Sequence, residues 1–445
     1  MLCVFRRLFS QCADRWRLRV VPLVVLVCAA LSASLAHGQA EDDGSSRRAA
    51  LQAAREAKTD ADLAPKPRTR LESALLWVEE NNVPLILTGA LQTPVRVLPG
   101  GIGPETGIGG RLAYVPFFRR DDLDVFLAAG GSHRGYWALE ATAGYRQPQW
   151  FGYSYARWRD RRDRFTVTGQ NTRLLDDGFS IGNEIRYDVA DLTTGGVFGL
   201  RPTPALTLAV GGAYAQYDPN PDPNNQYDEP GGPSIPFSEQ TRYTGVTAHL
   251  IWDTRDARYE RGFGERYTPN TDALTDRPLS PHTGTLLTIE GMRFFESTNT
   301  DGDFAQLTVE AQQYLSFWSK YHTLALRHRT VLTDPDNRAR VPFYQLPYLG
   351  GAHTLRGYDT FRFRDLHALV YNVEYRWQVW LMADLVLFAD AGKTFDEATA
   401  WGLTNLQTSV GGGLRIATDR STLVRLEVAR SPEDVRFTVR FSSSF

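Results

Sequence analysis

Short segments in which apolar and polar residues alternate recur along the chain from Thr106 onward. Each is close to the length of a tilted membrane strand, which needs roughly 9–11 residues. Alternation with a period of two predicts β-strands that have one apolar and one polar face. We mark sixteen such strands, an even number, as a closed antiparallel barrel with both termini on one side requires. The predicted strands are Gly107–Pro116, Asp124–Gly131, Gly135–Tyr145, Trp150–Arg159, Phe179–Asp188, Leu192–Arg201, Ala205–Tyr217, Arg242–Asp253, Gly284–Phe295, Asp303–Ser316, Tyr321–Thr333, Leu366–Trp380, Met382–Ala391, Leu406–Ala417, Thr422–Arg430 and Val435–Phe445.

The alternation is clearest near the carboxyl end of the chain. In Leu366–Trp380 large apolar residues such as Val373 and Trp377 face one way, while Glu374 and Arg376 face the other. A soluble sandwich also buries one face of each strand, so alternation alone does not separate a sandwich from a barrel. However, no second layer of predicted helices or strands is left to cover the apolar faces. Lipid is the natural cover for them.

The pattern therefore predicts an all-β fold, a 16-stranded antiparallel transmembrane β-barrel that occupies residues 106–445. The predicted location is the outer membrane of a bacterium, because that is where barrels of this kind are found.

The first part of the chain has a different character. Residues 1–38 are predicted to be a signal peptide, with a basic stretch, the apolar run Val20–Leu35 and small residues after it. The apolar run is short for a spanning helix, which needs about 20 residues. An uncleaved anchor is the alternative. Residues 39–105 are polar and helix-prone, and we expect a periplasmic linker with short helices there.

Composition narrows the possible functions. The chain has 49 basic and 51 acidic residues, so no broad basic surface indicates nucleic-acid binding. The mean hydropathy of −0.33 excludes a helical membrane protein. It is compatible with a barrel, whose inward residues are polar and lower the average. Aromatic residues make up 12% of the chain, which suits the aromatic girdles of a barrel.

No pattern indicates catalysis. The histidines stand singly, without the spacing of a metal site such as HExxH, and the chain has no GxSxG motif. All three cysteines, Cys3, Cys12 and Cys28, lie in the predicted signal peptide, so the mature chain would have no thiol chemistry and no disulfide. We therefore expect no catalytic residue, no metal and no cofactor, and we predict that the protein is not an enzyme.

One connection, Val341–Asp365, is unusual. It is too rich in polar residues, proline and glycine to be a strand, and too aromatic to be an ordinary solvated loop. Its centre is Leu355–Tyr358, which contains Arg356. A cation inside such a loop needs an anion to face, and the following strands offer two inward candidates, Glu374 and Asp390.

Loop lengths test the predicted topology, because long loops of such barrels lie outside the cell. With a periplasmic amino terminus, the long connections Tyr217–Gln240 and Val341–Asp365 are external, as expected. Two other long connections, Asp160–Gly178 and Ala257–Thr283, fall on the periplasmic side and break the rule.

The second half of the chain, roughly Tyr243–Phe445, resembles the carboxy-terminal domain of the Omp85 superfamily, the BamA- and TamA-like surface antigen barrels. Several short motifs occur in the order of that family. They are Asp253–Asp256 followed by Pro281–Gly284, the glycine and arginine motif Gly350–Tyr358, the strand motifs Asn372–Arg376 and Phe388–Gly392, the glycine run Gly411–Arg415, and the terminal Phe445 in phase with Phe437, Val439 and Phe441.

The resemblance implies a role for Arg356, which in this family folds back into the barrel lumen and pairs with an acidic residue of the wall. Asp390 matches the family position of that acid, and Glu374 is the second candidate. Gly357 and Tyr358 complete the loop motif. A guanidinium held by a carboxylate in a partly dry lumen makes strong bidentate bonds, which would order the long loop.

The resemblance also implies partners. Phe437, Val439, Phe441 and Phe445 would form the terminal signal that the outer-membrane insertion machinery reads. Residues 39–105 show no POTRA module, which larger members carry, so the chain is similar to the small members that lack it. We expect contact with outer-membrane lipid, and assistance with insertion or translocation of an unidentified protein or lipid. The alternative is a passive diffusion channel, and a membrane enzyme is a third possibility.

Overall fold

The computed structural model describes residues 95–99, 106–114, 123–166, 184–221, 239–256, 281–297, 302–317, 319–336, 341–380, 383–417 and 422–440. The predicted signal peptide and nearly all of the predicted linker lie outside these residues. Within the described ranges, no helix is long and apolar enough to cross a membrane.

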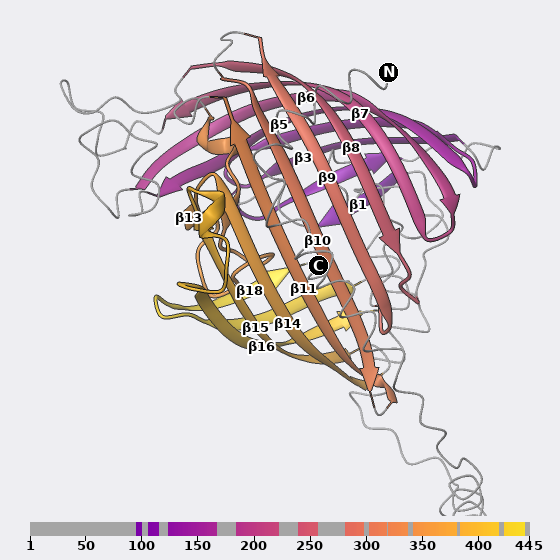
Figure 1. The fold of residues 1–445 in the computed structure, drawn as a ribbon, viewed down its shortest axis with the longest axis vertical. Coiled ribbons are helices and arrows are strands. Elements are labelled where there is room, and N and C mark those ends of the chain that lie inside the picture. Colours follow the sequence, from indigo (N-terminus) through magenta and orange to yellow (C-terminus); the bar gives the residue numbers. More distant parts are fainter. Residues whose placement is uncertain are drawn as a thin grey trace, which may run out of the picture. The chain divides into compact units, whose positions relative to one another are not determined.

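Sixteen strands form one antiparallel sheet, in which each strand pairs with the next one along the chain (Figure 1). Two further strands, β12 (Tyr348–Leu349) and β13 (Phe363–Arg364), pair only with each other, inside the connection between β11 and β14. The strands of the sheet are β1 (Val95–Pro99), β2 (Gly109–Tyr114), β3 (Leu123–Ser132), β4 (Trp137–Arg146), β5 (Trp150–Thr166), β6 (Glu184–Thr203), β7 (Leu206–Pro221), β8 (Thr241–Asp253), β9 (Gly284–Glu296), β10 (Phe304–Phe317), β11 (Ser319–Pro335), β14 (His367–Trp380), β15 (Ala383–Phe395), β16 (Gln407–Ala417), β17 (Thr422–Arg430) and β18 (Val435–Arg440).

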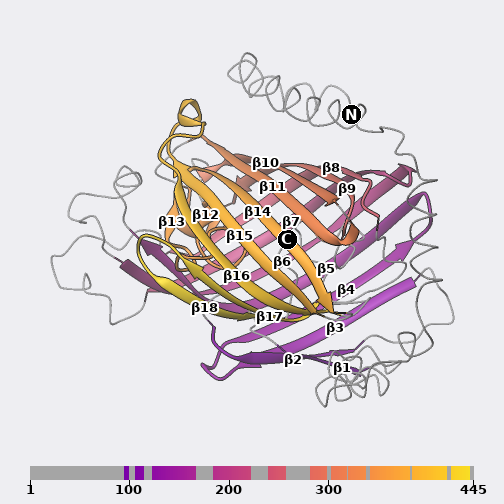
Figure 2. The same ribbon diagram turned by 90° about the horizontal axis from the view of Figure 1, so that it is seen from below.

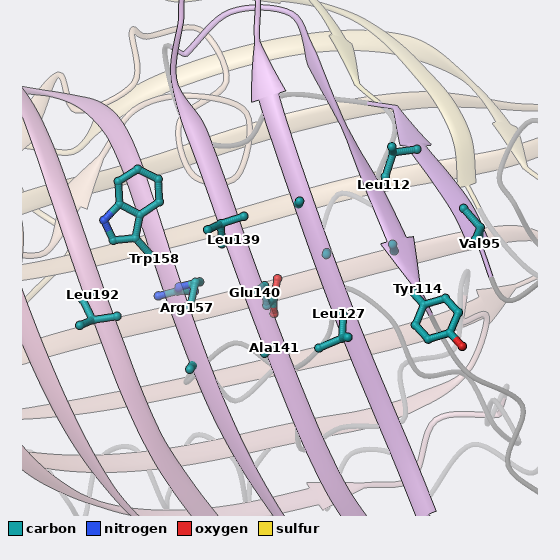
Figure 3. A pocket seen from close by; sticks show the side chains of 14 residues that line it. Val95, Leu112, Tyr114, Leu127, Leu139, Glu140, Ala141, Arg157, Trp158 and Leu192 are labelled. Carbon is teal, nitrogen blue, oxygen red and sulfur yellow. The ribbon is translucent and has the colours of Figure 1, made fainter.

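The polar face of the sheet is the buried one. In β14, Glu374 and Arg376 are 0% and 5% exposed, whereas Val373 and Trp377 are 43% and 44% exposed. Figure 3 shows the same division near the start of the sheet, where Leu139 and Trp158 project from one face. A soluble protein buries its apolar face, and the reverse arrangement is typical of a membrane barrel. We call the face with the buried polar residues the inner face.

The predicted strand Leu192–Arg201 and the described part of Phe179–Asp188, residues 184–188, belong to one strand, β6. The predicted break between them is therefore wrong. Asp191 lies in the predicted break. Its side chain points to the inner face, where its carboxylate lies 3.0 Å from the guanidinium of Arg161 on β5. The same ion pairs explain why β5 continues through its charged end as far as Thr166.

The continuous β6 also removes one of the two exceptions to the loop-length rule. The connection 166–184 now lies on the same side of the sheet as the connection between β11 and β14, where long loops are expected. The other exception, the connection 253–284, stays on the opposite side, and residues 257–280 of it are outside the described ranges.

The sheet begins earlier than residue 106. Val95–Pro99 pairs with Gly110–Tyr114 of β2, inside the stretch that the sequence assigned to a linker. Pro94 precedes this strand and Pro99 ends it, so its alternating pattern is too short to predict a strand from the sequence. A proline at a strand end is compatible with pairing, because its missing N–H is not needed there. The sheet has sixteen strands, the predicted number, because the additional strand β1 compensates for the two predicted strands that form the single strand β6.

β1 and β18 form the two edges of the sheet. Among the described residues they are not paired with each other, so each has one neighbouring strand. β1 pairs with β2, and β18 pairs with β17.

Candidate functional site

The connection between β11 and β14 folds back onto the inner face of the sheet. Its hairpin of β12 and β13 lies against β14 and β15 (Figure 2). Leu355, Tyr358 and Phe361 are each no more than 2% exposed, which is unusual for a loop. Gly350 and Gly351 begin the central turn with φ values of +113° and +82°, which favour glycine.

Arg356 contacts Asp390 through three hydrogen bonds. The Nε and Nη2 atoms of Arg356 donate to Oδ2 and Oδ1 of Asp390 at 2.9 and 2.7 Å, and the backbone N–H of Arg356 donates to Oδ2 at 3.1 Å. The side chain is 4% exposed and the carboxylate 0%. A bidentate guanidinium–carboxylate pair is among the strongest polar contacts of a protein interior.

Glu374 faces the same arginine. The Nη1 atom of Arg356 donates to Oε2 of Glu374 at 2.9 Å. Glu374 also lies 2.6 Å from Arg376 and 2.6 Å from Arg415. The sequence placed Asp390 first and Glu374 second. The structure brings both to Arg356, and Glu374 has more cationic neighbours.

Four arginines and three carboxylates make up this buried group, which we call the arginine cluster. Besides the residues already named it contains Arg425 on β17, whose guanidinium lies 2.5 Å from Glu427. Glu427 is also 3.7 Å from Arg356. Its members are Arg356, Arg376, Arg415, Arg425, Glu374, Asp390 and Glu427.

The geometry holds the guanidinium of Arg356 in its charged form. Burial by itself lowers the pKa of Arg356, but the hydrogen bond and charge of Asp390 and the charge of Glu374 outweigh it, and the pKa is raised. The guanidinium also lies over the ring of Phe388, 3.4 Å from its centroid, which adds a cation–π contact.

Gly357 stands where the loop touches the wall most closely. A Cβ atom on this glycine would lie 2.8 Å from the Cβ of Ser409 and 2.9 Å from that of Ser431. Ser409 in turn donates to Asp390 at 3.2 Å. The glycine of the loop motif is therefore required by close approach of the backbone to β16 and to the turn after β17.

We expect Gly357→Ala to destabilise the docked loop by about 1–3 kcal/mol, because the added methyl group forces the loop away from Ser409. The measurement is the temperature at which the purified protein changes from its folded to its unfolded gel mobility. Gly291→Ala is the matched control, since a Cβ atom there would meet nothing within 4 Å. Equal transition temperatures for the two variants would contradict the prediction.

Aromatic residues fix the first part of the loop to the opposite wall. Phe343, in the short 3-10 helix η5 (Phe343–Gln345), packs on Tyr187 of β6 with ring centroids 4.5 Å apart. The hydroxyl groups of Tyr344 and Thr241 are 2.6 Å apart. Arg364 bonds to Asp163 of β5 at 2.6 Å. The loop thus joins β5–β8 to β14–β17 across the inner face.

Ion pairs also connect the loop to the last hairpin of the sheet. Arg362 donates to both carboxylate oxygens of Glu433 at 2.9 and 3.0 Å. Arg436 on β18 lies 2.5 Å from Asp359. These pairs are partly exposed, so each contributes little stability alone. Together they place the end of the loop beside the edge strand β18.

The other residues that the sequence predicted for the loop motif and the terminal signal lie outside the arginine cluster. Tyr358 is buried against Phe363, and its hydroxyl lies 3.3 Å from Gln407, so it does not join the arginine cluster. Phe437 and Val439 are 67% and 48% exposed on the outer face of β18. Phe441 and Phe445 lie outside the described residues, and the role of this end as an insertion signal stays a prediction.

Sequence reasoning missed much of the arginine cluster. Arg376, Arg415, Arg425 and Glu427 were given no role, although each has the inward parity of its strand. The signal was present, because an arginine and a glutamate two residues apart on one strand share a face. Nothing in the sequence said which neighbouring strands would bring these faces together.

In the described ranges, no group of three or more histidine, cysteine, aspartate or glutamate residues could hold a metal ion. The polar groups of the site are arginines and carboxylates that already bind one another. The arrangement is suited to holding a loop rather than to proton transfer.

Proteins of one superfamily resemble this chain in sequence and in fold. A sequence model described as the Omp85 superfamily domain matches residues 136–444. Among solved structures, BamA from Haemophilus ducreyi lacking POTRA domains 1–3 is similar, with a TM-score of 0.52 and 11% identity over 78% of this chain and 67% of that chain. CdiB from Escherichia coli gives a TM-score of 0.47 and 11% identity over 79% and 67%. No curated protein sequence matches significantly.

Proposed function

This chain belongs to the Omp85 superfamily, and from that premise we propose that it assists the insertion or passage of a protein or lipid at the outer membrane. It is a bacterial outer-membrane protein. We further propose that its sheet closes into a 16-stranded transmembrane barrel, that residues 1–38 are a signal peptide, and that it acts without catalysis. Its proposed partners are outer-membrane lipid, the insertion machinery and a client.

The observation that carries the proposal is the position of the buried loop beside an edge strand of the sheet. Arg356 ties the loop to β14 and β15, and Arg436 ties it to β18. In the described residues β18 pairs only with β17, so its other edge is open for pairing. An unpaired strand edge can accept an incoming strand. The proposed mechanism is local opening between β1 and β18, with the loop keeping the rest of the lumen in place.

The proposed function is tested in liposomes that contain the purified protein. A urea-unfolded outer-membrane barrel protein is added as client, and its insertion is followed by gel mobility without boiling. We expect faster insertion than in empty liposomes and in liposomes that contain an unrelated porin. Equal rates in all three would contradict an insertion role for this class of client.

The rival function, a passive channel, has a different signature. A wide polar lumen would give a large and stable ion conductance in planar bilayers. The loop fills part of the inner face, so we expect low or unsteady conductance from the intact protein. A large steady conductance without any effect on client insertion would favour the channel.

Closure of the barrel is tested separately. Unboiled protein from the membrane fraction is expected to migrate differently from boiled protein and to resist protease, as closed barrels do. Recovery in the soluble periplasmic fraction, with no mobility shift, would show that the sheet does not close in a membrane.

A further inference from the structure

A cavity of about 1220 Å³ lies on the inner face of the sheet, next to the buried loop. Nine arginines line it, but only one carboxylate, that of Asp163. The chain as a whole has 49 basic and 51 acidic residues, so the excess of positive charge is local to the cavity. The arginines are Arg111, Arg134, Arg157, Arg159, Arg161, Arg293, Arg329, Arg364 and Arg440.

Three of these arginines form a row on β5. Arg157, Arg159 and Arg161 alternate with Trp158, which is 37% exposed on the outer face. Figure 3 shows Arg157 behind the strand from which Trp158 projects. Residues two apart on a strand are separated by about 6.6–6.8 Å, so the row presents regularly spaced guanidinium groups.

Carboxylates neutralise only part of this row. Asp191 lies 3.2 Å from Arg159 and 3.0 Å from Arg161. Asp163 lies 2.5 Å from Arg161 and also 2.6 Å from Arg364 of the loop. Asp191 and Asp163 thus form ion pairs with three arginines, which are Arg159 and Arg161 of the row and Arg364 of the loop.

Arg157 has no such partner. Among the described residues, its side chain makes no hydrogen bond and no ion pair within 4 Å, and its Nε atom is buried without an acceptor. Glu140 stands opposite Arg157 in the register of β4 and β5, and its carboxylate lies 3.7 Å from the guanidinium of Arg111. One carboxylate there faces two arginines. A buried donor without an acceptor costs free energy unless a ligand or water satisfies it.

Other walls of the cavity show the same deficit of acceptors. Arg329 on β11 reaches Glu310 only at 3.8 Å, because that carboxylate is already bound by Arg327 at 2.9 and 3.0 Å. The Nε atom of Arg329 is buried without an acceptor. Arg440 on β18 hydrogen-bonds to His353 of the loop rather than to a carboxylate. Guanidinium groups that have a buried donor without an acceptor therefore enter the cavity from β5 and β11.

We propose that this cavity binds a phosphorylated polyanion, with Arg157 and Arg329 as contact residues. A guanidinium group presents planar pairs of donors that match phosphate oxygens, and several phosphates in one ligand would use the spaced arginines together. The phosphates could belong to a soluble polyphosphate or to a lipid headgroup, and the inference does not depend on the proposed function.

The test is calorimetric titration of the full-length protein in uncharged detergent with tripolyphosphate, at physiological salt. We expect saturable binding that weakens roughly tenfold or more in Arg157→Gln, because the variant loses charge-assisted hydrogen bonds to phosphate. Arg329→Gln is the second variant, in case the first does not fold. Arg186→Gln is the matched control, because that side chain is 56% exposed, pairs with Glu184 and does not line the cavity.

A second titration uses short-chain phosphatidic acid in the same detergent. Binding of tripolyphosphate that depends on Arg157 or Arg329 supports a soluble ligand, whereas binding of phosphatidic acid alone with the same dependence supports a lipid headgroup. The proposal is overturned if neither compound binds, or if both arginine variants and the Arg186 control bind equally. Client insertion in liposomes is a separate readout, so failure here leaves the proposed function standing.

Discussion

Arg356→Ala is expected to release the loop from the inner face while the sheet stays folded. The substitution removes the only arginine that bonds to Asp390 in the described residues, and one of three that face Glu374. Removing one partner of a buried ion pair costs about 3–5 kcal/mol, because the other charge stays buried. The pair is nearly inaccessible, so solvent screening reduces this figure little. The backbone ladders of β14–β17 are untouched, so the sheet should still form.

Loop release can be measured with a single cysteine. The chain beyond residue 38 contains no cysteine, so Ala352→Cys, at a position that is 7% exposed, would be the only thiol once the proposed signal peptide is removed. We expect slow thiol labelling of the cysteine introduced by Ala352→Cys alone, and fast labelling when Arg356→Ala is combined with it. Unchanged gel mobility without boiling would show that the sheet is intact.

The matched control is Arg362→Ala, which removes a partly exposed pair with Glu433 and should change labelling little. A double-mutant cycle of Arg356→Ala with Asp390→Asn should give a coupling free energy of roughly 1–3 kcal/mol. Additive effects of the two substitutions would show that the pair does not hold the loop.

Glu374→Gln is expected to lower the thermal stability of the whole sheet more than Asp390→Asn. Glu374 is fully buried and contacts arginines from the loop, from β14 and from β16. Loss of its charge leaves four guanidinium groups facing two carboxylates, and the cost should reach at least several kcal/mol. Asp390 has one arginine, and its other donors are the neutral groups Asn372 and Ser409 and a backbone N–H.

The measurement is again the temperature of the change in gel mobility. Glu433→Gln is the control, because that carboxylate is 42% exposed and pairs only near the surface. The order expected for the loss of thermal stability is Glu374→Gln, then Asp390→Asn, then Glu433→Gln. If Asp390→Asn proves the most damaging, Asp390 rather than Glu374 organises the cluster.

Much of the candidate site could be predicted from strand parity and the loop motif. Inward parity selects Asp390 and Glu374, because side chains two apart on a strand share a face. The ranking of these two carboxylates could not be predicted. It depends on Arg376 and Arg415, and whether their guanidinium groups meet at Glu374 is settled by the pairing of β14 with β15 and β16.

The sequence by itself determined the class of fold and the polarity of its two faces. Alternation is a local property, and it survives in almost every predicted strand. The charged run at the end of β5 and Asp191 on β6 were the places where local reasoning failed. There the chain looks like a loop, but ion pairs between the two strands make continued pairing favourable.

Only the tertiary structure decided where the charges gather. The chain is nearly neutral overall, and the spacing of Arg157, Arg159 and Arg161 shows only that they share a face. Which carboxylates lie near these arginines depends on the curvature of the sheet and on which charged residues the loop places against its inner face. The loop brings Arg364 toward β5 and Arg356 toward β14. Contacts between residues far apart in sequence therefore set the positive cavity and the buried cluster, because charge interactions depend on distance in space.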